Sequence, residues 1–127
     1  KNILKELLEE NSEDYFILFN NEVVGNFRFI WDEKLTGLSK ENQIKLHRIY
    51  LHPKAQGNGI GKTLLAWLDA KAIKKGYEII WLDAMDAQSK VFQFYIKLGY
   101  SYHSHVFLPF HFLHAAVRKM SQIYKKL

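Results

Sequence analysis

The stretch AQGNGIGKT, residues 55–63, places glycine at positions 57, 59 and 61. It follows an apolar, strand-like run and precedes residues with helical spacing. Glycine lets backbone N–H groups converge, and the N-terminus of a helix is electropositive, so a loop of this kind is suited to hold a phosphate group. The question is which phosphate-bearing ligand the rest of the chain selects.

The residues on either side of this loop predict a strand, a helix and a second strand. Residues 44–51 alternate in a way typical of a strand that is partly covered on both faces, and residues 78–83 form a short apolar run. Between them the helical period is carried by apolar residues at 60, 64, 65, 67, 68 and 72, and Gly76 stands where a left-handed residue ends a helix. This order predicts a parallel strand-helix-strand crossover.

The remaining segments predict two more helices and two hairpins. Helical spacing marks residues 2–10 and 86–98, and Gly99 follows the second of them. Asn20-Asn21 tolerates positive φ and predicts a turn. The four strands expected in the hairpins are residues 15–19, 23–31, 100–107 and 114–120. The fold class is therefore α/β, with a central mixed, mostly antiparallel sheet flanked by helices.

Composition narrows the class of protein further. With 127 residues, 48% apolar and 15% aromatic, the chain is long enough for one folded domain and is not disordered. No apolar run reaches the roughly 20 residues of a membrane helix, and there is no cysteine. We expect a cytoplasmic protein without a membrane partner. The net charge of +5 favours an anionic ligand, but the basic residues are spread along the chain, so nucleic acid is not an expected partner.

Two nucleotide-binding motifs come close to the loop without matching it. A P-loop ending in Lys62 and Thr63 requires glycine at position 56, where Gln56 stands. A dinucleotide-binding loop beginning at Gly57 requires glycine at position 62, and Asp83 lies too far along the chain to be its ribose-binding carboxylate. Both ligand classes are disfavoured.

Two motifs together resemble those of the GNAT superfamily of N-acetyltransferases. Residues 56–61, QGNGIG, are similar to its acyl-CoA pyrophosphate loop, Gln/Arg-x-x-Gly-x-Gly/Ala. Residues 94–100, FYIKLGY, resemble its second motif, Phe-Tyr-x-Lys-x-Gly-Phe, at the expected distance. The resemblance implies a GNAT-like fold for residues 1–127 as a single N-acetyltransferase domain that lacks the first strand and helix of the usual fold.

The resemblance also implies a cofactor and the residues that bind it. The cofactor is acetyl-CoA, with its pyrophosphate on the glycine-rich loop and its pantetheine arm beside the strand at residues 44–51. The implied binding residues are Ile49, Tyr50, Leu51, Gln56, Gly57, Asn58, Gly59, Ile60, Gly61, Lys62, Thr63, Gln88, Phe94 and Lys97. The family usually has Asn where Gln88 stands and Ala where Val91 stands.

Two residues are candidates for acid-base catalysis. The second motif implies that Tyr95 is the general acid that protonates the leaving thiolate, although its spacing with Val91 and Leu98 also fits a core tyrosine. His47 stands where related sequences often carry Glu, so it is a candidate general base. It also fits a partly buried strand histidine, and the sequence leaves the two roles open.

The implied function is transfer of an acetyl group to a primary amine, by direct attack in a ternary complex. The acceptor is a polyamine, another small amine or a protein amine; residues 48–51, RIYL, resemble a polyamine-acetylating branch. The alternative is a non-catalytic acyl-CoA-binding sensor.

His103 and His105 with His111 and His114 do not predict a metal site, because no cysteine or carboxylate joins them. A mixed sheet of this kind leaves an exposed edge strand, and pairing of that edge with a second copy of the chain would give a homodimer.

Overall fold

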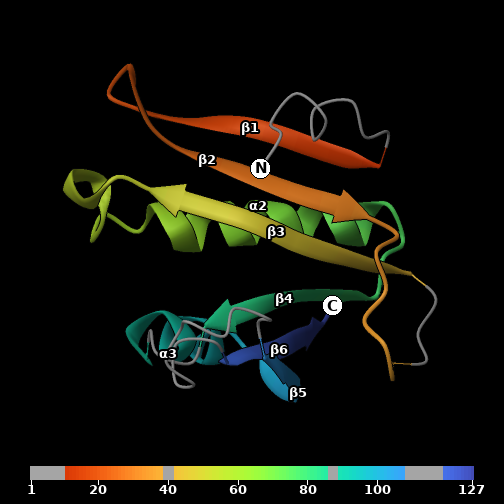
Figure 1. Ribbon diagram of the computed structural model, residues 1–127. Helices are drawn as coiled ribbons and strands as arrows, with labels where there is room; N and C mark the ends of the chain where they lie inside the picture. The colour runs from red at the N-terminus through yellow and green to blue at the C-terminus, as the bar shows by residue number, and fades with distance from the viewer. Residues whose placement is uncertain (1–10, 39–41, 86–88, 108–118) are drawn as a thin grey trace.

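The computed structural model describes residues 11–38, 42–85, 89–107 and 119–127. Their elements, in chain order, are β1 (Ser12–Phe19), β2 (Glu22–Trp31), β3 (Gln43–Leu51), the 3-10 turn η1 (Pro53–Ala55), α2 (Ile60–Lys74), β4 (Ile79–Met85), α3 (Ser89–Lys97), β5 (Ser101–Phe107) and β6 (Lys119–Lys126) (Figure 1). The helix predicted over residues 2–10 lies outside the described residues.

The strands form one six-stranded sheet in the order β1-β2-β3-β4-β6-β5. Only β3 and β4 run parallel, and every other neighbouring pair is antiparallel. The predicted mixed, mostly antiparallel sheet with one parallel crossover is therefore confirmed. Residues 114–118 of the last predicted strand lie outside the described residues. β6 (Lys119–Lys126) extends beyond the predicted end at Met120, and the polar run KMSQIYKK pairs with both β4 and β5. Its inward-facing Ile123 is fully buried, which the polar neighbours hid at the sequence level.

The turn between β1 and β2 confirms a local prediction. Asn20 and Asn21 have φ values of 53° and 65°, so both central residues adopt the left-handed conformation. Two such residues match the twist of an antiparallel hairpin, and asparagine tolerates that conformation better than most residues. The hairpin places Asp14 of β1 directly opposite Arg28 of β2.

The parallel pair opens soon after it begins. β3 and β4 pair only at Gln43↔Ile79, Ile44↔Ile80 and Lys45↔Trp81, although the strands run on to Leu51 and Met85. Figure 1 shows the two arrows separating toward their tips. Beyond Trp81 no strand of the described residues pairs with the edge of β4 that faces β3, and a gap opens between the two strands.

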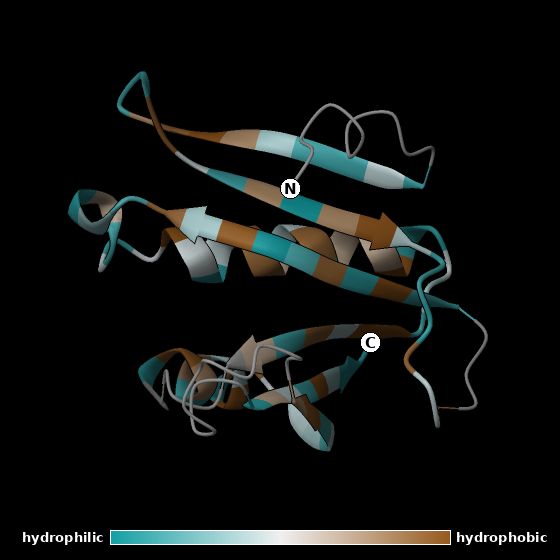
Figure 2. Ribbon diagram, in the orientation of Figure 1, coloured by the Kyte–Doolittle hydropathy of each residue, from teal (hydrophilic) through white to brown (hydrophobic). Residues whose placement is uncertain are grey.

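A β-bulge at His47 changes which side chains face the helices. Phe29 of β2 lies opposite Leu46, but Arg28 lies opposite Arg48, so His47 is an extra residue in β3. The strict alternation predicted for residues 44–51 is therefore wrong beyond Leu46. Ile49 packs against the main core on the same side as Leu46. Figure 2 shows a hydrophilic stretch in the middle of β3, between hydrophobic residues on either side.

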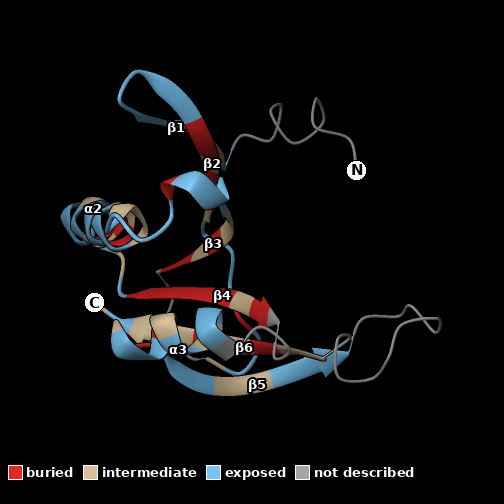
Figure 3. Cartoon of the chain, turned by 90° about the vertical axis from the view of Figure 1, so that its left-hand side faces the viewer, coloured by how far each residue is buried: buried red, intermediate tan, exposed pale blue. Residues whose placement is uncertain are grey.

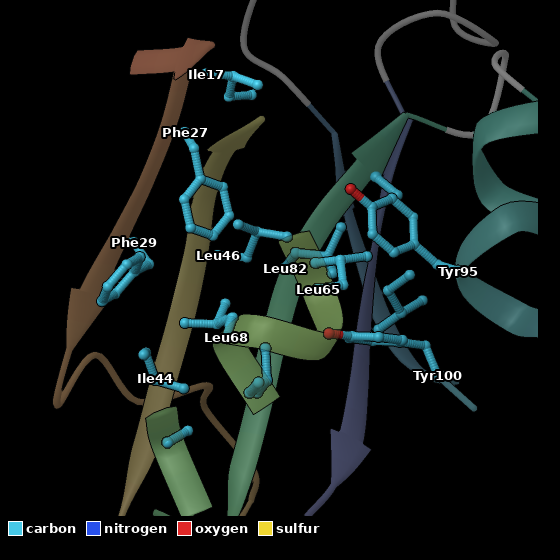
Figure 4. Packing of buried hydrophobic residues seen from close by; sticks show 14 of the residues in the cluster. Ile17, Phe27, Phe29, Ile44, Leu46, Leu65, Leu68, Leu82, Tyr95 and Tyr100 are labelled. Carbon is cyan, nitrogen blue, oxygen red and sulfur yellow. The ribbon is translucent and has the colours of Figure 1, made fainter. Parts of the chain in front are cut away.

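The core lies between the sheet and the two helices. Phe27, Ile44, Leu68 and Ile123 are among its most buried members, and Figure 4 shows side chains from β2, β3, β4, α2 and α3 meeting there. Figure 3 shows β4 buried along most of its length and β1 mostly exposed. β4 is thus a rigid central element against which the gap opens.

The three tryptophans differ in how far the structure buries them. Trp81 is buried and Trp31 is partly buried, whereas 42% of the surface of Trp67 is exposed although its position fits the apolar period of α2. Trp67 lies at the border of the apolar side of α2, where its ring packs edge-on against Tyr15 and Phe27. Helical spacing alone does not locate the border of a buried stripe.

Candidate active site

The glycine-rich loop is held in shape by its amide side chains. Gln56 donates from Nε2 to the carbonyl oxygen of Leu51 at 3.0 Å, and Asn58 donates from Nδ2 to the carbonyl oxygen of Ala55 at 3.0 Å. Gly57 and Gly59 have φ values of 82° and 73°, which favour glycine. A Cβ atom at either glycine would meet no atom within 4 Å. The two glycines therefore leave open space above the loop.

The N-terminus of α2 lies at the edge of this space. Gly59 is its N-cap and has no side chain with which to cap the helix, and the first turn carries no acidic residue. The first N–H groups of a helix lack intrahelical partners and carry the positive end of the helix dipole. The backbone around residues 59–62 is thus a suitable site for an anion.

A cavity of about 440 Å³, which we call the loop cavity, lies over these residues. It is lined by Ile49, Leu51, Gln56, Gly57, Gly59, Ile60, Gly61, Lys62, Lys90, Val91, Phe94 and Tyr95. A Cβ atom on Gly61 would lie 3.3 Å from the Phe94 ring, so glycine at this position lets α2 approach α3 closely. Nine of the fourteen residues implied as cofactor-binding line this one cavity.

The other five implied residues do not line the loop cavity. Tyr50 is 51% exposed and lines a separate depression with Val23 and His52. The Thr63 hydroxyl donates to the Gly59 carbonyl oxygen at 3.0 Å. Asn58 is engaged within the loop as described, Lys97 is exposed in the last turn of α3, and Gln88 lies outside the described residues.

A second cavity of about 270 Å³, the central cavity, occupies the gap between β3 and β4. It is lined by Leu46, His47, Arg48, Ile49, Leu82, Asp83, Ala84, Val91, Tyr95 and Met120. Ile49, Val91 and Tyr95 line both cavities. A ligand that has its anionic part at the loop could therefore reach the gap between the strands past these three side chains.

Tyr95 lines both the loop cavity and the central cavity. Its side chain is 4% exposed, and Figure 4 shows its ring projecting from α3 toward β4. Burial raises the pKa of Tyr95 to about 12, so its hydroxyl is protonated at neutral pH. Tyr95 thus belongs to the core and also lines both cavities.

His47 is held by a buried arginine. Arg28, 1% exposed, donates from Nε to Nδ1 of His47 at 3.0 Å and from Nη1 to Oδ2 of Asp14 at 2.9 Å. Because the arginine is always protonated, the imidazole nitrogen that it contacts must be the acceptor. His47 lines the central cavity with that nitrogen already engaged.

Sequence reasoning missed Lys90, Val91, Arg48 and Asp83 as cavity-lining residues. Val91 lies one helical turn before Tyr95, and Lys90 one turn before Phe94, so the i,i+4 spacing could have indicated both. Arg48 and Asp83 gave no such signal. Arg48 reaches its position through the bulge, and Asp83 through the divergence of β3 and β4.

No group of three or more His, Asp or Glu side chains in residues 11–38, 42–85, 89–107 and 119–127 could hold a metal ion. In the same ranges no helix is long and apolar enough to cross a membrane.

Comparison with known proteins identifies the family. The model of the Acetyltransferase (GNAT) family matches residues 2–100. The chain belongs to this family. A GNAT relative, the uncharacterized N-acetyltransferase in the pepI 3′ region of Lactobacillus delbrueckii subsp. lactis, is 26% identical over 104 residues; the match covers 81% of this chain and 60% of the relative. The chain thus spans about 60% of that relative's length.

Solved structures share the GNAT fold. A GNAT family acetyltransferase from Elizabethkingia anophelis with acetyl-CoA bound aligns with a TM-score of 0.77 and 18% identity, covering 100% of this chain and 84% of that one. The PaiA N-acetyltransferase from Thermoplasma acidophilum in complex with coenzyme A aligns with a TM-score of 0.70 and 21% identity, covering 98% of this chain and 67% of that one. The expected GNAT-like fold is confirmed.

Proposed function

We propose that this GNAT protein transfers an acetyl group from acetyl-CoA to a primary amine. The observation that carries the proposal is that the two cavities share Tyr95 in their lining, with the N-terminus of α2 beside one cavity and the gap between β3 and β4 occupied by the other. This arrangement puts an anion site next to a chamber in which the acetyl group could be transferred.

The cofactor would bind across these two cavities by main-chain groups. The pyrophosphate would be held by the N–H groups of the loop and of the first turn of α2, with Lys62 adding positive charge. Ile49 and Leu51 would hold the pantetheine arm toward the gap between the strands. There the edge of β4 beyond Trp81, which pairs with no strand of the described residues on that side, offers N–H groups that can stabilise the oxyanion of the thioester carbonyl.

The chemistry requires one proton to move from nitrogen to sulfur. The amine nitrogen attacks the thioester carbonyl carbon and forms the C–N bond, and the C–S bond then breaks. Tyr95 can donate its O–H proton to the departing sulfur and accept the proton that the nitrogen loses. With a pKa of about 12 the phenol is a weak acid beside a thiol of pKa about 8.5, so we expect both transfers to be coupled rather than sequential.

The experiment that tests this function is a charge placed in the anion site. Gly59→Asp adds a carboxylate to the open space above the loop, and we expect acetyl-CoA to bind at least about tenfold more weakly by calorimetry. Gly76→Asp is a matched control, because Gly76 has a φ of 82° and equally open surroundings but lies after the far end of α2. Equal affinities in all three proteins would contradict the assignment of the loop.

Thiol release separates the enzyme from the alternative, an acyl-CoA-binding sensor. The wild-type protein should release free CoA from acetyl-CoA when a suitable primary amine is present, and no more than the background without one. Tight binding of acetyl-CoA with no amine-dependent release across a broad amine panel would favour the sensor.

A further inference from the structure

Side chains from both faces of the sheet line the central cavity. Leu46 of β3 and Ala84 of β4 belong to the main core, which lies between the sheet and the helices. Asp83 also lines the cavity, but it alternates with Leu82 and Ala84 along β4, so its side chain projects from the opposite face. The part of the cavity on the helix side of the gap, which we call the helix-side half, is therefore distinct from the part on the Asp83 side.

The helix-side half is almost entirely apolar. The described residues that line it are Leu46, Ile49, Leu82, Ala84, Val91 and Tyr95. Among these side chains only the Tyr95 hydroxyl is polar, and it is the group to which we assign proton transfer. Because apolar surface gains free energy on leaving water, the hydrocarbon chain of an acyl group is favoured in this half.

Ala84 makes the helix-side half deeper than an acetyl group needs. Ile80 and Leu82, on the same face of β4, are larger and equally buried, so a leucine in place of Ala84 would add three carbons to this wall. The cavity measures about 270 Å³, whereas the three heavy atoms of an acetyl group occupy roughly 90 Å³, at about 30 Å³ for each water-sized atom. Space for a longer chain therefore remains beside the attacking amine.

Val91 bounds the same half from α3. It lines the loop cavity as well as the central cavity, and its side chain is exposed rather than part of the buried core. Its isopropyl group thus limits the space available to a chain that extends from the thioester. Its size can be changed without opening a void in the core.

We propose that this protein also takes acyl-CoA donors with chains longer than acetyl, and prefers propionyl-CoA and butyryl-CoA, with the chain in the helix-side half and its length limited by Ala84 and Val91. This inference rests on the proposed transfer to an amine and concerns the donor. The amine nitrogen bonds to the carbonyl carbon, the C–S bond breaks and one proton passes from nitrogen to sulfur, giving an N-acyl amine and free CoA. The chain takes no part in these bond changes, so burial alone selects its length.

The first test measures the binding of CoA thioesters by calorimetry, without an amine. Burial of one methylene group corresponds to about a fourfold gain in affinity. We expect propionyl-CoA and butyryl-CoA each to bind about fourfold more tightly than the thioester that is one carbon shorter. Binding of propionyl-CoA that is no tighter than that of acetyl-CoA would overturn the inference.

Thiol release with a fixed amine gives the corresponding rates. We expect kcat/KM to be at least about fourfold higher with propionyl-CoA than with acetyl-CoA, because the chain stays buried in the transition state. A preference for acetyl-CoA would overturn the inference and leave acetyl transfer intact. No thiol release with any thioester would contradict the proposed function instead, and the calorimetric series would still decide whether the chain is buried.

Two substitutions change the helix-side half in opposite directions. In a series from acetyl-CoA to hexanoyl-CoA the wild type should bind butyryl-CoA most tightly. Val91→Ala removes two carbons from the wall and should move the tightest binding to a longer chain. Ala84→Val adds two carbons and should move it to acetyl-CoA. An unchanged chain-length preference in Val91→Ala would overturn the inference.

Val106→Ala is the matched control for Val91→Ala. Both valines are 44% exposed, but Val106 lies on β5 and lines neither cavity. The control should keep the wild-type preference, and an equal shift in both variants would contradict the role of Val91. If Ala84→Val overpacks its buried site and does not fold, Val91→Ala and its control decide the inference without it.

Discussion

Two tyrosines in contact differ in what their hydroxyl groups can do. The rings of Tyr95 and Tyr100 pack edge to face with centroids 5.5 Å apart, and both side chains are buried. Tyr95 lines both cavities, but the Tyr100 hydroxyl is buried with no hydrogen-bond partner among the described residues. Of the two, Tyr95 therefore carries the catalytic role proposed above, and Tyr100 serves packing.

Tyr95→Phe should lower kcat by about 10²-fold, because the variant cannot pass a proton to the departing sulfur. The affinity for acetyl-CoA should stay close to that of the wild type, since the ring and its packing are retained. Thiol release under saturating acetyl-CoA measures the first quantity and calorimetry the second. A wild-type rate would remove Tyr95 from the mechanism.

Tyr100→Phe is the matched control and a prediction about stability. The substitution removes a buried hydroxyl that lacks a partner, so the free energy of unfolding should be unchanged or rise by about 1 kcal/mol. Turnover should remain at the wild-type level. Urea denaturation measures the stability, and a clear destabilisation would indicate that the hydroxyl has a partner in solution.

At the scale of elements, α2 connects the loop to the core. Leu65, Leu68 and Ala72 are its buried residues, whereas Ile73 on the same helix is 58% exposed. The helix thus presents a narrow apolar stripe to the sheet and holds its N-terminus beside the loop cavity. An apolar residue on α2 contributes to stability only when it lies on this stripe.

Leu68→Ala should lower the free energy of unfolding by about 2–5 kcal/mol, because it leaves a cavity in a fully buried position. Ile73→Ala, the same kind of truncation on the exposed side, should change it by less than about 0.5 kcal/mol. Denaturant midpoints measured in parallel compare the two. Similar losses for both variants would contradict the orientation of α2.

At the scale of the whole molecule, buried phenols make the fold sensitive to alkali. Burial raises the pKa of Tyr95 to about 12 and raises the pKa of Tyr100 further, helped by the nearby Asp69. An unfolded chain releases these protons near pH 10, before the folded chain does. Above that pH the unfolded state binds fewer protons, so stability falls as pH rises.

The expected result is a free energy of unfolding that declines from about pH 10 toward about pH 12, the region in which Tyr95 titrates in the folded protein. The double variant Tyr95→Phe with Tyr100→Phe should show a shallower decline than the wild type. Urea denaturation series at several alkaline pH values measure both slopes. Identical slopes would mean that these two phenols do not carry the effect.

Much of the fold and part of the candidate site could be predicted from the sequence. The Asn20-Asn21 hairpin, the helix that begins at Ile60 and the parallel crossover depend on local φ preferences and on a 3.6-residue period, which short stretches encode. The same is true of the glycine-rich loop, because its φ values and its position before a helix follow from neighbouring residues. These features, with the second motif, were enough to indicate the family.

The tertiary structure alone decided what surrounds the central cavity. Nothing local marks the extra residue at His47, since a bulge is defined by the partner strand, and it is the bulge that places Arg48 beside Arg28. The Nδ1 contact of His47 likewise depends on a residue 19 positions away. Sequence periodicity therefore predicted the elements, whereas register and pairing between distant strands determined which side chains can meet a substrate.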